Sequence, residues 1–239
     1  TQMSRVQALS GGTAQDLEAL RGTVLERGSP TQFSATQAAE GMEALALGGL
    51  NASQIVQAMP GLLGLAAAEQ LSLGSAAGIT TAIMNTFGIS ADQAGTVVDQ
   101  LLSVSSNAAV GVDDIGKSLE YAGPAAAALG MSLPETTAAL GLMANQGIKG
   151  SQAGTALGAV LSDLTANVQD GRVDFGAFAV DIYDAQGQMR PFGDILRDIE
   201  AGTNGMSDAQ RNAALSSVFQ RQSLRGVNVL LAEGSGKYD

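Results

Sequence analysis

The stretch "GMSLPETTAALGLMANQGIKGSQAGTALG" (130–158) contains the two sequence features that decide the fold. It opens with Gly130 and an apolar residue, followed by Ser132 and, three positions later, Glu135. Glycine in the left-handed conformation ends one helix, serine caps the next, and glutamate bonds back to the serine amide. The pattern therefore predicts that one helix ends and another begins within a few residues.

The same combination of residues recurs along the chain. It is found at 49–54, 88–93 and 205–210, and Ser34 with Gln37 repeats it after Phe33 in place of glycine. Breaks at intervals of roughly 20 residues predict an all-α array of short helices, or helical hairpins, joined by Gly/Ser-capped turns. We expect helices over 13–26, 35–47, 52–68, 75–87, 91–106, 113–127, 133–146, 151–167, 192–201, 208–220 and 222–232.

One segment near the C-terminus has the period of a strand. In "FAVDIYDAQGQMRPF" (178–192), Phe178, Val180 and Ile182 alternate with smaller or polar residues. Asp184 to Gly187 is a turn signal, and Pro191 ends the pattern. We therefore expect one small β-hairpin near 178–191, packed on a neighbouring helix.

The glycines that end the opening stretch allow three interpretations. A phosphate-binding loop needs a strand before it and a lysine followed by Ser or Thr, whereas Lys149 precedes Gly150 and follows a helix. "EGSGK" (233–237) lacks the spacing glycine. Gly150, Gly154 and Gly158 are four apart and share one helix face, so we interpret them as sites of close helix packing.

A membrane helix face is the remaining interpretation. Residues 44–68 and 70–91 carry no charge and are long enough to span a bilayer. Both contain polar side chains or helix-capping signals, and Pro60 interrupts the first. We therefore expect no stable membrane-spanning helix in the resting protein.

Composition excludes several classes of site. The chain has no cysteine and no histidine, which removes thiolate chemistry, Cys/His zinc sites and imidazole-dependent triads. A net charge of −11 without a basic run argues against nucleic-acid binding. We expect no catalytic residue, no cofactor and no metal.

Charge is spread unevenly. Residues 44–162 hold 9 charged groups, whereas residues 163–239 hold 18. Together with the Ala/Gly-rich middle, this predicts an N-terminal helical lead-in (1–33), a helical core (34–168), and a hairpin with C-terminal helices (169–239). Because the chain starts Thr1-Gln2, we expect it to be a fragment of a longer protein.

The charged groups with helical or clustered spacing have ordinary explanations. Asp174, Asp181 and Asp184 surround the predicted hairpin and are expected to serve turns and surface contacts. Asp113 and Asp114 are expected to cap a helix. Three arginines on helical spacings are expected to form a solvated or interface face: Arg211, Arg221 and Arg225.

Several segments, taken in order, resemble the core of phage tail tape measure proteins. They are "MNTFGISADQAGTVVDQL" (84–101), "YAGPAAAALGMSLPETTAALGLMANQ" (121–146), "GIKGSQAGTAL" (147–157), "DAQGQMRPFGDILRDI" (184–199) and "SDAQRNAALSSVFQRQSLRGVNVLL" (207–231). The resemblance extends from about residue 32 to 232. One departure is Gln220-Arg221, where relatives are expected to have a glycine-rich turn. The matching signature residues are Gly123, Pro124, Gly130, Gly147, Lys149, Gly150, Gly154 and Gly158.

The resemblance implies a structural virion protein rather than an enzyme. It implies a homo-oligomer, located inside the tail tube or tail tip, that helps to determine tail length and takes part in genome ejection. The implied partners are other copies of the chain, the tail tip or baseplate hub, distal tail proteins and the tube lumen. The alternative is a membrane-active element that forms a DNA-passage channel and contacts the host inner membrane transiently during ejection.

Overall fold

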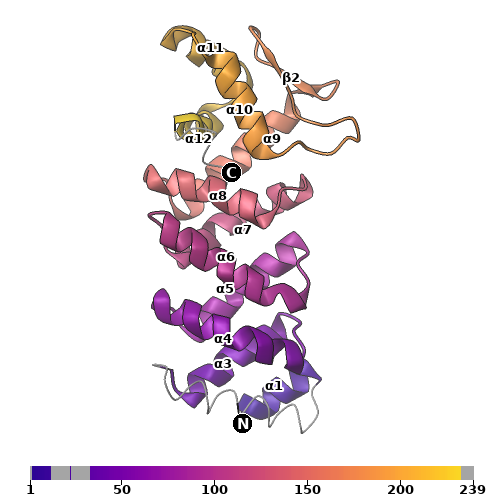
Figure 1. The fold of residues 1–239 in the computed structure, drawn as a ribbon, viewed down its shortest axis with the longest axis vertical. Helices are drawn as coiled ribbons and strands as arrows, with labels where there is room; N and C mark the ends of the chain where they lie inside the picture. Colours follow the sequence, from indigo (N-terminus) through magenta and orange to yellow (C-terminus); the bar gives the residue numbers. More distant parts are fainter. Residues whose placement is uncertain (1, 12–21, 23–32, 233–239) are drawn as a thin grey trace. The chain divides into compact units, whose positions relative to one another are not determined.

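A computed structural model describes residues 2–11, 22 and 33–232 of the chain, and its secondary structure is mostly helical (Figure 1). Within these residues the α-helices are 9 to 17 residues long. The elements are, in order, α1 (Gln2–Ser10), α3 (Ala35–Leu47), α4 (Ala52–Ala68), α5 (Leu73–Phe87), the 3₁₀ turn η1 (Ala91–Gln93), α6 (Ala94–Asn107), α7 (Val112–Ala128), α8 (Leu133–Asn145), α9 (Gly150–Ala166), β1 (Val168–Gln169), β2 (Arg172–Asp174), β3 (Ala179–Asp181), α10 (Phe192–Thr203), α11 (Asp208–Val218) and α12 (Arg221–Ala232).

The chain forms two compact units. Unit 1 comprises residues 1–103 and 111–113, and unit 2 comprises residues 104–110 and 114–239. In unit 1, α3 packs on α1 and α5, and α4 packs on α3 and α5. The core of this unit is built from side chains such as Met42, Leu45, Ile55, Met59 and Leu62, all buried.

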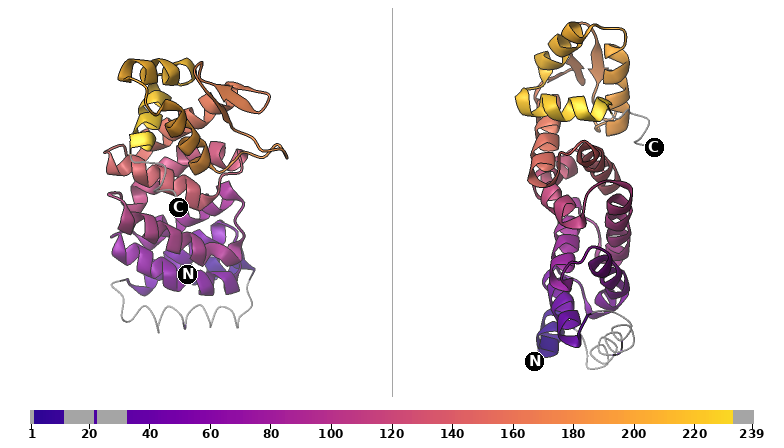
Figure 2. Two further views of the ribbon diagram at one scale, coloured as in Figure 1. Left: turned by 45° about the horizontal axis from the view of Figure 1, so that its top comes forward. Right: turned by 90° about the vertical axis from the view of Figure 1, so that its left-hand side faces the viewer.

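In unit 2, the C-terminal helix α12 packs on α9 and α8, and α10 packs on β3 (Figure 2). Aliphatic side chains of α9, α10 and α12 are fully buried between these elements. Phe175 adds one of the few aromatic groups to this core and stacks on Phe178, with ring centroids 4.8 Å apart. The core residues from the three helices include Leu157, Val160, Ile195, Ile199 and Leu230.

The predicted capping turns are confirmed at four of five positions. Capping boxes begin α3, α4, α8 and α11, with both reciprocal hydrogen bonds formed in each. The preceding glycines adopt the left-handed backbone where the sequence indicated it, for example Gly130 (φ 79°) and Gly205 (φ 77°). The remaining helix bounds agree with the predicted ones to within a few residues.

The fifth position differs. Ser90 forms no side-chain cap, and its hydroxyl donates to the Gln93 side chain 3.2 Å away. The Gln93 amide bonds the Ser90 carbonyl at 2.9 Å, which is a 3₁₀ arrangement. The helix expected over 91–106 therefore starts as η1 before α6. Helix α1 lies within the predicted helical lead-in (1–33), although no helix was expected at its bounds. The helix expected over 13–26 lies almost entirely outside the described residues.

The predicted hairpin is part of a larger, three-stranded antiparallel sheet in the order β1-β2-β3. Its turn is present, because Tyr183 bridges to Met189 and the Asp184 amide bonds the Gln188 carbonyl at 2.8 Å. The main partner of β3, however, is β2, which lies before it in the chain. The missed signal is Asp170-Gly171, whose positive φ values of 49° and 80° fit a two-residue hairpin turn between β1 and β2.

Candidate functional site

The most tightly constrained place in unit 2 is the contact between α7 and α9, here called the glycine seam: Gly150, Gly154 and Gly158 against Asp114, Ser118 and Tyr121. A Cβ at position 154 would lie 2.1 Å from the Ser118 carbonyl oxygen and 2.9 Å from its carbonyl carbon. These are backbone atoms, which cannot turn aside as a side chain can. Glycine at 154 is therefore required for the two backbones to approach this closely.

The two ends of the seam are less crowded than its centre. At position 158 a Cβ would lie 3.6 Å from the Tyr121 carbonyl oxygen, which is ordinary van der Waals contact. At position 150 the constraint is conformational, because φ is +57° and the Asp114 carboxylate lies 3.2 Å from a Cβ there. The buried Ser118 hydroxyl lies 2.8 Å from the carbonyl oxygens of Gly150 and Asp114 and joins the two helices.

The other signature residues do not converge on the seam. Gly123 is buried within α7, and Pro124 is exposed in the same helix. Gly130 and Gly147 occupy turns with φ of 79° and 78°. Lys149 is the N-cap residue of α9 and is exposed, and helix α8 rather than a strand precedes it, so the requirements of a phosphate-binding loop are not met.

A second set of contacts, which the sequence did not predict, anchors the starts of three helices. The Glu69 carboxylate accepts the Val112 amide of α7 at 3.1 Å, and Glu135 accepts the Phe192 amide of α10 at 2.7 Å. Asp163 accepts the Gln220 amide before α12 at 2.9 Å. Each carboxylate satisfies a free amide and places negative charge at a helix N-terminus, where the backbone dipole stabilises it. We call these three the long-range caps.

Asp163 is the most buried of the three carboxylates, at 9 % exposure. Besides the Gln220 amide it accepts hydrogen bonds from the buried Ser223 hydroxyl and, at 3.4 Å, from the Gln220 side chain. The Gln220-Arg221 sequence, which departs from the expected glycine-rich turn, is thus the place where α9 fixes the start of α12. Phe219 before it is extended and buried.

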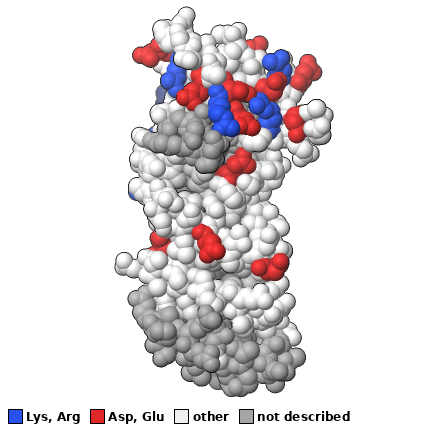
Figure 3. Space-filling model, viewed as in Figure 1, with Lys and Arg blue, Asp and Glu red and all other residues white. Residues whose placement is uncertain are grey.

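Charged side chains gather on unit 2 around α10 and the sheet, on the face shown in Figure 3. Arg172 pairs with Asp181 at 2.8 Å, and Arg190 pairs with Asp198 at 2.7 Å. Asp174 and Asp184 accept backbone amides of their own turns. The acidic residues around the sheet therefore serve turns and surface pairs, as expected. Asp113 and Asp114 lie in the first turn of α7, whose first amide is held by Glu69.

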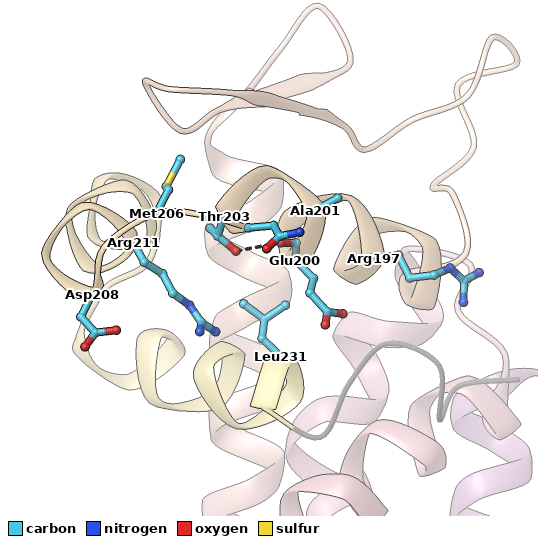
Figure 4. A pocket seen from close by; sticks show the side chains of 10 residues that line it. Arg197, Glu200, Ala201, Thr203, Met206, Asp208, Arg211 and Leu231 are labelled. Atoms are coloured by element: carbon cyan, nitrogen blue, oxygen red, sulfur yellow. Dashed lines mark hydrogen bonds between the residues drawn. The ribbon is translucent and has the colours of Figure 1, made fainter.

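A hollow of about 620 Å³ lies between the C-terminal half of α10, the start of α11 and the end of α12 (Figure 4). Its lining is of mixed charge, with Arg197 and Arg211 beside Glu200 and Asp208. Arg211, one of the three arginines expected on a solvated or interface face, lines this hollow, where its Nε has no hydrogen-bond partner. Across the described ranges, no group of three or more carboxylates could hold a metal ion.

Comparison with known proteins gives consistent matches. The model of a family described as "Phage-related minor tail protein" matches residues 21–220. The tape measure protein of Pneumococcus phage Dp-1 is 36% identical over 238 residues, which are 100% of this chain and 21% of that protein. The probable tape measure protein of Escherichia phage P2 is 30% identical over 241 residues, 99% of this chain and 30% of that protein. No solved structure matches.

The glycine seam generates a prediction with opposite signs at two neighbouring glycines. Gly154→Ala forces apart two backbones and is expected to lower the free energy of unfolding by about 2 kcal/mol or more. Gly158→Ala meets only an ordinary contact and is expected to raise it by up to about 1 kcal/mol, since alanine favours the helix. Urea unfolding followed by circular dichroism measures both. Equal changes in the free energy of unfolding at the two positions would contradict the close backbone approach at Gly154.

The long-range caps generate a second prediction. Asp163→Ala leaves the Gln220 amide and the Ser223 hydroxyl without their acceptor, so unfolding should become easier by about 1–3 kcal/mol. Asp163→Asn keeps one acceptor oxygen and should lose less. Asp99→Ala, at an exposed position of α6, is the matched control and should change stability by less than about 0.5 kcal/mol. If Asp163→Ala changed the free energy of unfolding no more than Asp99→Ala, the Asp163 cap would make no contribution to stability.

Proposed function

We propose a role for this chain from the premise that it belongs to the phage-related minor tail protein family, the family of tape measure proteins. It is accordingly a component of the phage tail and part of the virion. The chain spans about a fifth to under a third of the length of the curated relatives it matches. The role of the whole protein therefore has to be divided between this region and the sequence outside it.

The proposal is that this chain is a folded docking region, and that the protein containing it helps to determine tail length. The observation that carries it is the shortness of the helices. The longest described helices have 17 residues, about 26 Å at 1.5 Å per residue. Capped turns end them, and the glycine seam and the long-range caps hold the chain folded back within each unit. A length standard needs extended sequence instead, which we assign to the region outside these residues.

We further propose where and with what the docking region assembles. It would sit inside the tail tube or at the tail tip and contact the baseplate hub, distal tail proteins and other copies of itself. It would leave the tail with the genome at ejection. The acidic net charge of −11 supports passage of DNA along it without binding. A structural role without enzymatic activity agrees with the family.

The alternative function, a membrane-active element that forms a DNA-passage channel, has one observation in its favour. No single helix in the described ranges has the length and hydropathy to cross a bilayer, yet α4 and α5 pass that test together, with a bend of 117° between them. In the folded unit, apolar side chains of both helices are buried, including Leu62 and Leu65 of α4. The alternative therefore requires unit 1 to open before α4 and α5 could meet lipid.

Tail length in electron micrographs tests the docking role. An in-frame deletion outside residues 1–239 should shorten tails by about 1.5 Å per deleted residue if the deleted region is helical. Deletion of residues 88–130, which removes Ser118 from the seam, should abolish tails instead. Gly154→Leu should act like the inner deletion, and Gly158→Ala serves as its matched control. Tails of normal length from both deletions would contradict the proposal.

Liposome leakage tests the alternative. If α4 and α5 open into lipid, the purified chain should release a trapped dye after acidification or with anionic lipid. Leu62→Glu, which places a charge in the bent pair, should then abolish release, whereas Glu40→Gln at the surface should not. Absence of leakage under all of these conditions would exclude the membrane-active function for this chain.

A further inference from the structure

The basic side chains in the described part of the chain divide into those with an acidic partner and those without one. Arg5, Arg172, Arg190 and Arg197 each form an ion pair with a carboxylate. Within residues 2–11, 22 and 33–232, the cations with no ion pair or hydrogen bond are Lys149, Arg211, Arg221 and Arg225. Unpaired cations are unexpected in a chain of net charge −11, where carboxylates are in excess.

Two of these cations line a single groove in unit 2, and a third flanks it. The groove has a volume of about 600 Å³ and lies between the start of α9 and the start of α12. Arg221 and Arg225 are four residues apart and lie on one face of α12. Lys149 directly follows the lining residue Ile148. We call this the arginine groove: Ile148, Gln152, Ala156, Gln220, Arg221, Gln222 and Arg225.

The groove has the chemistry of a peptide site. Ile148 and Ala156 are buried and give it an apolar base, whereas the two arginines are exposed. Three glutamine side chains supply carboxamides that can both donate to and accept from a peptide backbone. Arginine binds a carboxylate with two parallel hydrogen bonds. No lining residue is acidic, and the nearby carboxylate of Asp163 is already bonded to Gln220 and Ser223.

The arginines are not explained by the stability of their own helix. Arg221 is the first residue of α12, where a positive charge is opposed by the helix dipole. Two like charges four residues apart also repel by tenths of a kcal/mol. Each arrangement is mildly unfavourable in the isolated chain, and a carboxylate in the groove would reverse both effects.

We propose that the arginine groove docks an acidic surface segment of a second copy of this chain. The inference rests on the self-association included in the proposed function and names its surface. The charges are complementary, because exposed carboxylates without a described partner occur on the same chain. They are Glu40, Asp92, Asp99, Glu120, Asp170 and Asp208. A groove on one copy that binds a different surface of the next is a heterologous contact, which closes into rings when the rotation allows.

The first test measures the mass of the 239-residue chain in solution by light scattering after size exclusion. The wild type should self-associate at low salt and dissociate as salt screens the exposed charges. Arg221→Glu combined with Arg225→Glu should weaken association by at least about tenfold. The matched control is Arg5→Glu with Arg172→Glu, which changes the net charge equally at exposed ion pairs and should leave association unchanged.

A second measurement does not depend on a charge reversal. The chain has no cysteine, so Gln222→Cys places a unique thiol in the groove for a photo-crosslinker. The expected product is a dimer whose crosslinked peptide from the second copy contains one of the exposed carboxylates. A crosslink at Asn107→Cys, an exposed position of α6, provides the background.

Several results would overturn the inference. They are a monomeric wild type, association that persists in the Arg221/Arg225 variant, and Gln222 crosslinks no more frequent than background. A monomer that binds a glutamate-rich peptide through the groove would also exclude a second copy as the occupant. None of these outcomes changes the result expected of the tail-length experiment. A groove that does not bind a second copy is therefore distinguishable from a chain that has no docking role.

Discussion

The approach of α7 to α9 is the constraint on which unit 2 depends. At Gly154 the two backbones are so close that a single added carbon atom would fall 2.1 Å from the Ser118 carbonyl oxygen. The seam sets the position of α9, and α9 in turn carries Asp163, which fixes the start of α12. The arginine groove lies between the start of α9 and the start of α12. One glycine therefore supports the packing, the long-range cap and the surface proposed to dock a second copy.

Helices in unit 1 also approach each other closely at glycines. A Cβ at Gly48 would lie 2.3 Å from Thr81, and one at Gly41 would lie 3.0 Å from Leu73. With aromatics at only 4% of the chain, large rings are not available to fill wide gaps between helices. Small residues bring the helices together until Ala, Leu and Val side chains reach one another. This explains how an Ala/Gly-rich sequence of low aromatic content buries a core in each unit.

The sequence predicted structural features that depend on neighbouring residues, such as helix caps and turns. It did not predict contacts between residues far apart in the chain. Capping boxes are local, so Asn51 with Gln54 and Ser132 with Glu135 were identified correctly. Ser90 fits the same local pattern and yet starts a 3₁₀ turn, so the pattern alone does not decide the cap. The long-range caps join residues 43 to 57 positions apart, and no local pattern marks them. Likewise, four-residue spacing identified a packing face at Gly150, Gly154 and Gly158, but not that only Gly154 lies too close to the opposite backbone to accept a Cβ.

The long-range caps also share an order along the chain. Glu69 precedes Val112, Glu135 precedes Phe192, and Asp163 precedes Gln220. A ribosome therefore releases each acceptor carboxylate before it makes the helix start that the carboxylate will hold. Since chains fold from the N-terminus during synthesis, each of these three helices can be captured by structure that already exists. Assembly of each unit can thus proceed in one direction, without waiting for residues that have not yet been translated.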